Sequence, residues 1–375
     1  MQVAALISDQ RHYEAGAKPM IALVHARRTP EHLFYGLVFH AGSEVTEFLS
    51  GKPGEWGVAG DLQSAESSLR KFDVEWILTD DYLPRLEFGL KLSKRLGVRH
   101  ATFVHILYGI QALNPSLRAE QNAAGFWGAT VSRYVPFGVL SSRYRIALQR
   151  SDLVIANSRF TARTLNTLYS QRADCVAYPP IDATIFNPQT NYPVLEKKYP
   201  LVYLGGRGEV PGSEMARMAR LLWLLNIRTC SVFGDRRAAE LWRRNYPGTT
   251  IARFELSDYE LSQLYRSATF TLLPDTWEDF GNVGPESLLC GTPVILSGYQ
   301  PWLEIVGPGS HARYIDSLAT DRVRSDSERI EVEPSDLSGA ITNLRLELSP
   351  DRFSERILDG MGRVEGSRGR TAPQL

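Results

Sequence analysis

The chain has 375 residues, 43% of them apolar and 10% aromatic, which is enough for two domains with hydrophobic cores. It carries 42 Lys or Arg and 42 Asp or Glu, so its formal net charge is zero. A general nucleic-acid binder is usually basic, so this balance argues against that class, although it leaves room for a local basic site for a phosphorylated ligand.

The cysteines and the N-terminus bound the cellular setting. Cys175, Cys230 and Cys290 are odd in number and widely spaced, and no CxxC pair occurs, so we expect small buried hydrophobes rather than disulfides or a zinc site. No signal peptide is indicated, and no run of about 18 apolar residues predicts a transmembrane helix. We therefore expect a cytoplasmic protein, with peripheral contact at a membrane left open.

The first half of the chain alternates predicted strands and helices. Strands are expected at 2–8, 33–40, 74–80, 98–105 and 151–158, and helices near 19–27, 63–71, 83–97 and 159–168. Gly97 is a candidate stop for the third helix, and Ser158 a candidate N-cap for the fourth. Such alternation predicts a parallel sheet, and parallel sheets bind ligands at the carboxyl ends of their strands.

Polar residues lie at two of these strand ends. Asp80 and Asp81 end one strand, and a metal-binding pair is one interpretation. A solvated strand terminus is favoured, because no third ligand lies nearby in the sequence. His100 is expected to pack within the next strand, whereas His105 lies at that strand's carboxyl end and is a candidate site residue.

Residues 106–146 are hard to interpret, because they interleave aromatic side chains with four Arg. This mixture is found at membrane surfaces and around lipid-phosphate acceptors. Helices that pack on the first domain would show the same mixture, and we favour that interpretation.

The second half repeats the alternation after a link that contains the paired prolines of 174–188. We place the domain boundary near Ala177. Strands are expected at 201–208, 229–234, 250–254 and 312–316, with a further one ending at Ser297, and helices at 213–226, 236–245, 258–268, 301–306, 336–348 and 351–364.

One stretch, Pro274 to Ser297, concentrates the chemistry. A Gly-rich turn, Phe280 to Gly284, enters a short helix from about Pro285, and Glu278 and Glu286 bracket the turn. Such a turn presents unpaired backbone N–H groups and the positive end of the helix dipole, which suits a phosphate. From spacing alone, a plain tight turn with a dipole-compensating Glu remains the alternative.

The same stretch resembles the signature of a known family. Glu278, one residue, Phe-Gly, four residues, Glu286 and then Gly-Thr-Pro-Val-Ile is similar to the motif of the retaining GT-B glycosyltransferases of family 4. The resemblance implies an α/β chain with two doubly wound, Rossmann-like domains and an interdomain cleft. Residues 1–177 would form the acceptor-side domain and 178–350 the nucleotide-sugar domain, while 351–375 would supply a helix that returns to the first domain and a mobile tail.

The resemblance also implies roles for the motif. Glu278 would contact the donor sugar or the reacting centre, and Glu286 would bind the ribose. The turn amides of four residues would hold the nucleotide diphosphate: Phe280, Gly281, Asn282 and Val283.

Three further residues match the family outside the motif. Arg207, at the end of the strand at 201–208, resembles an Arg that reaches the donor diphosphate, a task that suits a permanently charged, forked guanidinium. His105 falls where the family often has an active-site histidine. Gly16 falls where the family has a Gly-Gly loop, but Ala17 replaces the second Gly and weakens that assignment.

The clearest departure is a missing lysine. The family usually has a Lys about six residues after the Arg, and here that place falls on Ser213. Either Arg217 or Arg220 of the following helix replaces it, or diphosphate binding is weaker, or the chain binds sugars without catalysing transfer well.

Together these features predict a retaining, metal-independent glycosyltransferase that uses a nucleotide-diphosphate sugar and no other cofactor. The acceptor could be a glycan, as in polysaccharide biosynthesis, a lipid-linked molecule or a small molecule. The alternatives are a non-catalytic relative that binds nucleotide or glycan, and another GT-B enzyme such as a nucleotide-sugar epimerase or an inverting transferase.

Overall fold

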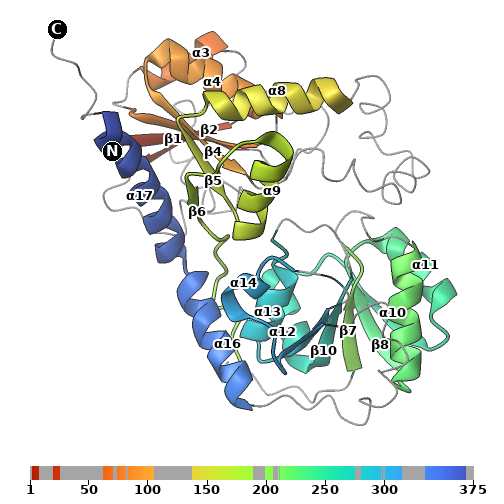
Figure 1. Ribbon diagram of the computed structural model, residues 1–375. Helices are drawn as coiled ribbons and strands as arrows, with labels where there is room; N and C mark the ends of the chain where they lie inside the picture. Colours follow the sequence, from red (N-terminus) through yellow and green to blue (C-terminus); the bar gives the residue numbers. More distant parts are fainter. Residues whose placement is uncertain are drawn as a thin grey trace, which may run out of the picture. The chain divides into compact units, whose positions relative to one another are not determined.

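The computed structural model describes residues 2–7, 20–25, 62–70, 74–81, 83–104, 137–188, 199–205, 210, 212–274, 280–296, 298, 300–314 and 334–368. These residues pack into two compact units, each built around a β-sheet (Figure 1). The first unit contains the described residues within Met1–Gly109, Val135–Pro180 and Pro350–Leu375, and the second those within Ile181–Ser349.

The sheet of the first unit has the strand order β2-β1-β3-β4-β5-β6. Its strands are β1 (Gln2–Ile7), β2 (Met20–His25), β3 (Trp76–Asp80), β4 (Arg99–Val104), β5 (Leu153–Ala156) and β6 (Cys175–Val176). Its helices are α3 (Leu62–Leu69), α4 (Leu83–Leu96), α8 (Phe137–Arg150), α9 (Arg159–Tyr169) and α17 (Pro350–Arg368). All pairings are parallel except that of β1 with β2.

The helix predicted near 19–27 is wrong. Residues Met20–His25 form β2, which pairs antiparallel with β1 from Gln2 opposite His25 to Ile7 opposite Met20. A short apolar run with β-branched residues fits a buried strand as well as a helix, and pairing with β1 decides the outcome. The strand predicted at 33–40 lies outside the described residues.

The predicted ends of two helices in the first unit are confirmed. Ser158 caps α9 by accepting a hydrogen bond from the Thr161 amide at 3.0 Å. Gly97 follows the end of α4 with a left-handed φ of 72°, a conformation that favours glycine.

The prediction of a solvated strand terminus is wrong for Asp81. This residue is buried, and it accepts a 2.9 Å hydrogen bond from the Tyr144 hydroxyl.

Helix α17 packs against the strands β5 and β6 of the first unit. Its Phe353 ring lies 5.7 Å from Phe103 of β4, and its Arg356 guanidinium stacks over Tyr178 at 4.7 Å. Cys175 lies beside this helix, where a Cβ on Gly360 would come within 3.0 Å of its sulfur. The glycine therefore permits close approach of α17 to the sheet.

The sheet of the second unit is parallel throughout and has the order β12-β11-β10-β7-β8-β9. Its strands are β7 (Tyr199–Tyr203), β8 (Thr229–Phe233), β9 (Thr249–Arg253), β10 (Ala268–Leu273), β11 (Val294–Leu296) and β12 (Ala312–Tyr314). Its helices are α10 (Gly212–Leu224), α11 (Arg236–Asn245), α12 (Asp258–Ser267), α13 (Val283–Leu289), α14 (Leu303–Val306) and α16 (Pro334–Glu347). This is the doubly wound order, in which the direction of winding switches between β7 and β10.

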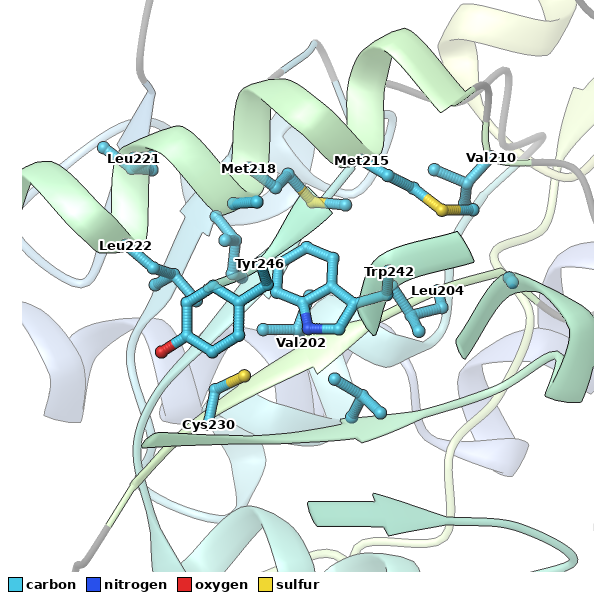
Figure 2. Close-up of a cluster of buried hydrophobic side chains, with 14 of the residues drawn as sticks. Val202, Leu204, Val210, Met215, Met218, Leu221, Leu222, Cys230, Trp242 and Tyr246 are labelled. Carbon is cyan, nitrogen blue, oxygen red and sulfur yellow. The ribbon is translucent and has the colours of Figure 1, made fainter. Parts of the chain in front are cut away.

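The core of the second unit lies between this sheet and the helices α10 and α11, and Figure 2 shows it. Trp242 of α11 is fully buried beneath Met215 and Met218 of α10 and stacks on Tyr246 at 5.3 Å. Cys230 is buried in the same cluster, and all three cysteines are unpaired, as expected. None of the helices in the described ranges combines the length and the apolar character that a membrane span needs.

Candidate functional site

A small cavity lies at the switch point of the second sheet, where β7 and β10 end. Its volume is about 10 Å³, which is room for about one water molecule. Residues from the two strand ends, from the start of α13 and from the loop before α14 line it: Tyr203, Leu273, Pro274, Gly281, Val283, Gly284 and Gln300. Doubly wound sheets bind their ligands at this place, so the cavity marks the candidate site.

The Gly-rich turn forms the helix-side wall of the cavity. Gly281 adopts a left-handed φ of 81°, and α13 begins at Val283, two residues before the predicted Pro285. The side chain of Asn282 makes no capping hydrogen bond, and the first-turn amides of a helix have no acceptor within it. This end of α13 therefore presents backbone donors beside the cavity.

Close packing on both sides fixes the turn that leads into α13. A Cβ on Gly284 would lie 2.4 Å from two carbons of the Trp302 indole, so only glycine fits at that position. Phe280, the first residue of the turn, is 2% exposed and anchors the turn in the core. The turn is thus held on both sides.

The other end of α13 is tied down by its backbone and by a buried hydroxyl chain. Gly291 and Thr292 donate to the carbonyls of Leu288 and Ser287, at 2.9 and 3.0 Å, which is the Schellman pattern of helix ends. The Ser287 hydroxyl donates to the Thr292 carbonyl, and it lies 2.8 Å from the Thr271 hydroxyl. Since a hydroxyl has one proton, Thr271 is the donor of that last bond.

Glu286 is held by a buried tyrosine. The hydroxyl of Tyr265, on α12, donates to Oε2 of Glu286 at 2.9 Å. Burial raises the pKa of Tyr265 well above its usual range, and the Glu286 carboxylate raises it further, so the phenol stays a neutral donor. Phe186 and Phe233 flank the phenol ring at 6.2 and 6.0 Å.

Tyr265 was not predicted as a site residue from the sequence. The residue lies on a helix that reads as an ordinary core helix, and 21 positions separate it from its partner. The only available signal was a tyrosine on the buried face of that helix, where a hydroxyl needs an acceptor.

The end of β8 lies against the end of β7, the strand whose Tyr203 lines the same cavity. Gly205 and Gly234 both have left-handed φ values, 76° and 112°, and a Cβ on Gly234 would lie 2.2 Å from the Gly205 carbonyl oxygen. That oxygen accepts a hydrogen bond from the Asp235 amide at 2.8 Å. Gly234, after β8, is therefore needed for the close approach of the backbone at Gly205.

The basic residues of α10 give no clear replacement for the missing lysine. Ser213 is exposed in the first turn of this helix. Arg217 forms an ion pair with the buried Glu214, at 2.6 Å from Nη2, and its Nε donates to the same oxygen at 2.8 Å. Arg220 is exposed on the same helix.

The remaining predicted site residues, Gly16, His105, Arg207 and Glu278, lie outside the described residues. His100 is described, and it is a packed strand residue as expected. Its ring nitrogens lie 3.2 Å from the Thr79 hydroxyl and 3.1 Å from the Ser151 hydroxyl, and burial lowers its pKa to about 3. The structure therefore brings together the turn and Glu286, within the second unit.

No protein-family model matches the chain. A probable transglycosylase of Burkholderia thailandensis is 34% identical over 127 residues, which cover 30% of this chain and 33% of that protein. The chain thus matches about a third of the length of this curated relative.

Solved structures, including the following two, resemble the chain over more of its length. Sucrose-phosphate synthase of Thermosynechococcus elongatus has a TM-score of 0.62 at 16% identity, and covers 82% of this chain and 77% of its own. HepE of Anabaena, solved with UDP and glucose, has a TM-score of 0.58 at 14% identity, and covers 80% of this chain and 79% of its own. The chain has the GT-B glycosyltransferase fold. At these identities the likeness shows the fold alone.

Proposed function

We propose that the chain is a retaining glycosyltransferase that moves a sugar from a nucleotide-diphosphate sugar to an acceptor. The observation that carries the proposal is the half-buried Glu286, which Tyr265 holds on the helix whose first residues line the cavity at the switch point of the second sheet. The GT-B fold, the similarity to a probable transglycosylase and the UDP and glucose bound by HepE support the same function.

The proposed roles follow the charge that develops in the reaction. Departure of the nucleotide leaves negative charge on the diphosphate and oxocarbenium-like charge on the sugar. Arg207 and the amides of Phe280 to Val283 would stabilise the diphosphate, and Glu278 the sugar. One lost donor at such a position typically raises the barrier by about 3–4 kcal/mol.

Two residues complete the proposed site. Glu286 would accept hydrogen bonds from the ribose hydroxyls, because a carboxylate accepts two donors at once. His105 would orient a donor hydroxyl or the acceptor from the first domain, and Gly16 would line the acceptor side. We propose no metal and no cofactor other than the donor, and the proposed acceptor is a glycan, a lipid-linked molecule or a small molecule.

A thermal-shift screen over nucleoside diphosphates and their sugars tests the donor site. A ligand at 100 times its dissociation constant stabilises the folded state by about 2.7 kcal/mol, so the correct donor should raise Tm visibly. Arg207→Ala and Glu286→Ala should remove most of that shift, whereas Arg243→Ala, at an exposed position of α11, should keep it. A wild-type shift in both site variants would reject the assignment.

A non-catalytic binding protein is the second candidate, and one observation favours it. The family's lysine position is Ser213, and the nearby Arg217 is already engaged with Glu214. A nucleotide sugar that raises Tm, but that releases no nucleoside diphosphate with any acceptor in a broad set, would favour this second function. Release of nucleoside diphosphate would favour transfer, and conversion of the donor to an isomer without acceptor would indicate an epimerase.

A further inference from the structure

Two neighbouring helices of the first unit, α4 and α8, are strongly basic although the chain is neutral overall. Helix α4 carries four Lys or Arg and α8 carries three, against a single acid in the two helices, Glu87. The formal net charge of the whole chain is zero. The cations of these neighbouring helices are therefore a local concentration of charge rather than a consequence of composition.

An open groove runs between the two helices, and several of these charged side chains line it. Its volume is about 910 Å³, and four cations and two carboxylates line it, a balance of +2: Lys91, Lys94, Arg143 and Arg150 against Glu87 and Asp152. Arg143 binds Glu87 across the groove at 2.6 Å, and Asp152 accepts from the His100 amide at 3.0 Å. Both groove carboxylates thus already have partners within the protein.

Three of the cations are available to an anion. Lys91, Lys94 and Arg150 are exposed, and in the part of the chain that the structure describes none of them forms an ion pair. Three exposed cations along one groove, without an ion pair among the described residues, attract anionic surfaces over about the Debye length, roughly 8–10 Å at physiological salt.

The exposed face of α8 is apolar as well as basic. Val139 and Ile146 are 49% and 43% exposed, and they alternate with Arg143 and Arg150 at helical spacing, so the four side chains form one stripe. The opposite side of the helix is buried through Tyr144 and Leu148.

We propose that this face, the stripe of α8 with the cations of α4, docks on an anionic lipid surface. Lys and Arg near such a surface contribute about a factor of five each to the binding constant, and exposed branched residues enter the headgroup boundary. A nucleic acid or another soluble polyanion would use the cations but gain little from Val139 and Ile146, and the stripe holds no aromatic ring for stacking bases. The proposal does not depend on the proposed enzyme activity.

Co-sedimentation of the full chain with lipid vesicles tests the proposal. The chain should bind vesicles of equal parts phosphatidylcholine and phosphatidylglycerol, and should not bind phosphatidylcholine alone. Added salt should weaken the binding. The triple variant Lys91→Ala, Lys94→Ala, Arg150→Ala should bind the anionic vesicles roughly a hundredfold less tightly.

Two controls separate lipid docking from unspecific charge. The triple variant Arg237→Ala, Arg243→Ala, Arg244→Ala removes the same charge from exposed positions of α11 in the second unit and should bind like the wild type. Ile146→Ser should weaken vesicle binding several-fold without changing the affinity for soluble polyphosphate. Equal loss in both triple variants, binding to neutral vesicles, or binding to polyphosphate but not to vesicles would overturn the proposal; circular dichroism checks that each variant is folded.

Discussion

Each unit of the molecule contains a polar cluster, and the two clusters differ in where they lie: His100 is on a strand, and Glu286 is on a helix. In the first unit, His100 is 1% exposed, lies in the first half of β4, and has a hydroxyl partner on each ring nitrogen. In the second, Glu286 is half-buried, and its helix starts at the cavity where β7 and β10 end. Position relative to the strand ends, rather than polarity, distinguishes a packed residue from a candidate ligand-binding residue.

The largest effect is expected from removing the carboxylate of the second cluster. Glu286→Ala should lower kcat/KM for transfer roughly a hundredfold, which corresponds to about 3 kcal/mol, the upper range for hydrogen bonds to a charged group. His100→Gln should leave kcat/KM near the wild-type value, because His100 is buried in the first half of β4 and both its ring nitrogens already have partners within the first unit. Steady-state assays of both variants make the comparison, and a larger loss in the histidine variant would reverse our interpretation of the two clusters.

The histidine cluster should instead affect stability through pH. Burial lowers the pKa of His100 to about 3, whereas an unfolded histidine has its usual value near 6.5. Between these values the unfolded state binds the extra proton, so the stability contributed by neutral His100 is present above pH 6.5 and is lost as the pH falls. At about 1.4 kcal/mol per unit, the loss by pH 5 is about 2 kcal/mol.

Urea unfolding at pH 7 and pH 5 measures this loss, with His100→Gln as the reference. Carboxylates contribute the same pH dependence to both proteins, so the difference between them isolates the histidine. Equal losses in wild type and variant would show that His100 titrates normally in the folded state.

Removing the hydroxyl of Tyr265 tests the second cluster separately from the carboxylate of Glu286. Tyr265→Phe removes the hydroxyl that donates to Glu286 and keeps the ring between Phe186 and Phe233. We expect nucleotide binding to weaken about tenfold, near the 1.4 kcal/mol of one hydrogen bond. Titration with a nucleoside diphosphate and with its deoxyribose counterpart distinguishes the causes, because a positioning role reduces the preference for ribose. A variant that is less stable, yet keeps the wild-type ratio of the two affinities, would assign Tyr265 a structural role only.

The sequence predicted regular elements well where local signals and tertiary pairing agree. Helix α11 was predicted at 236–245 and has these bounds, since its charged exposed face and buried Trp242 give a clear helical period. The apolar run at 20–25 carries no such period, and its pairing with β1 could not be read locally. Asp81 was misjudged for the same reason, because its partner Tyr144 is 63 residues away.

The residues of the candidate site likewise divide into those that a local motif predicts and those that only tertiary packing brings together. The turn and Glu286 are adjacent in the sequence and belong to a recognisable motif, so they were predictable. Tyr265 and Trp302 act on them from other elements, through a hydrogen bond to Glu286 and through packing on Gly284. No local pattern reports such contacts, which arise only when α12 and α14 pack beside α13.

The smallest expected effect is a gain in affinity for nucleoside diphosphate. Ser213→Lys places a cation in the first turn of α10, at the position where the family that the motif resembles usually has a lysine, and the exposed site can accept the longer side chain. An exposed charge contributes about 0.2–1 kcal/mol, so nucleoside diphosphate should bind up to about fivefold more tightly. Ala216→Lys, one turn further along and also exposed, adds the same charge and should change the affinity less.

If the gain is specific to position 213 and kcat also rises, the native serine limits an active transferase. If only affinity rises and no transfer is detected, the chain is a binding protein in which lysine is not the missing component. Equal gains at both positions would show that general charge, rather than the predicted diphosphate site, controls binding.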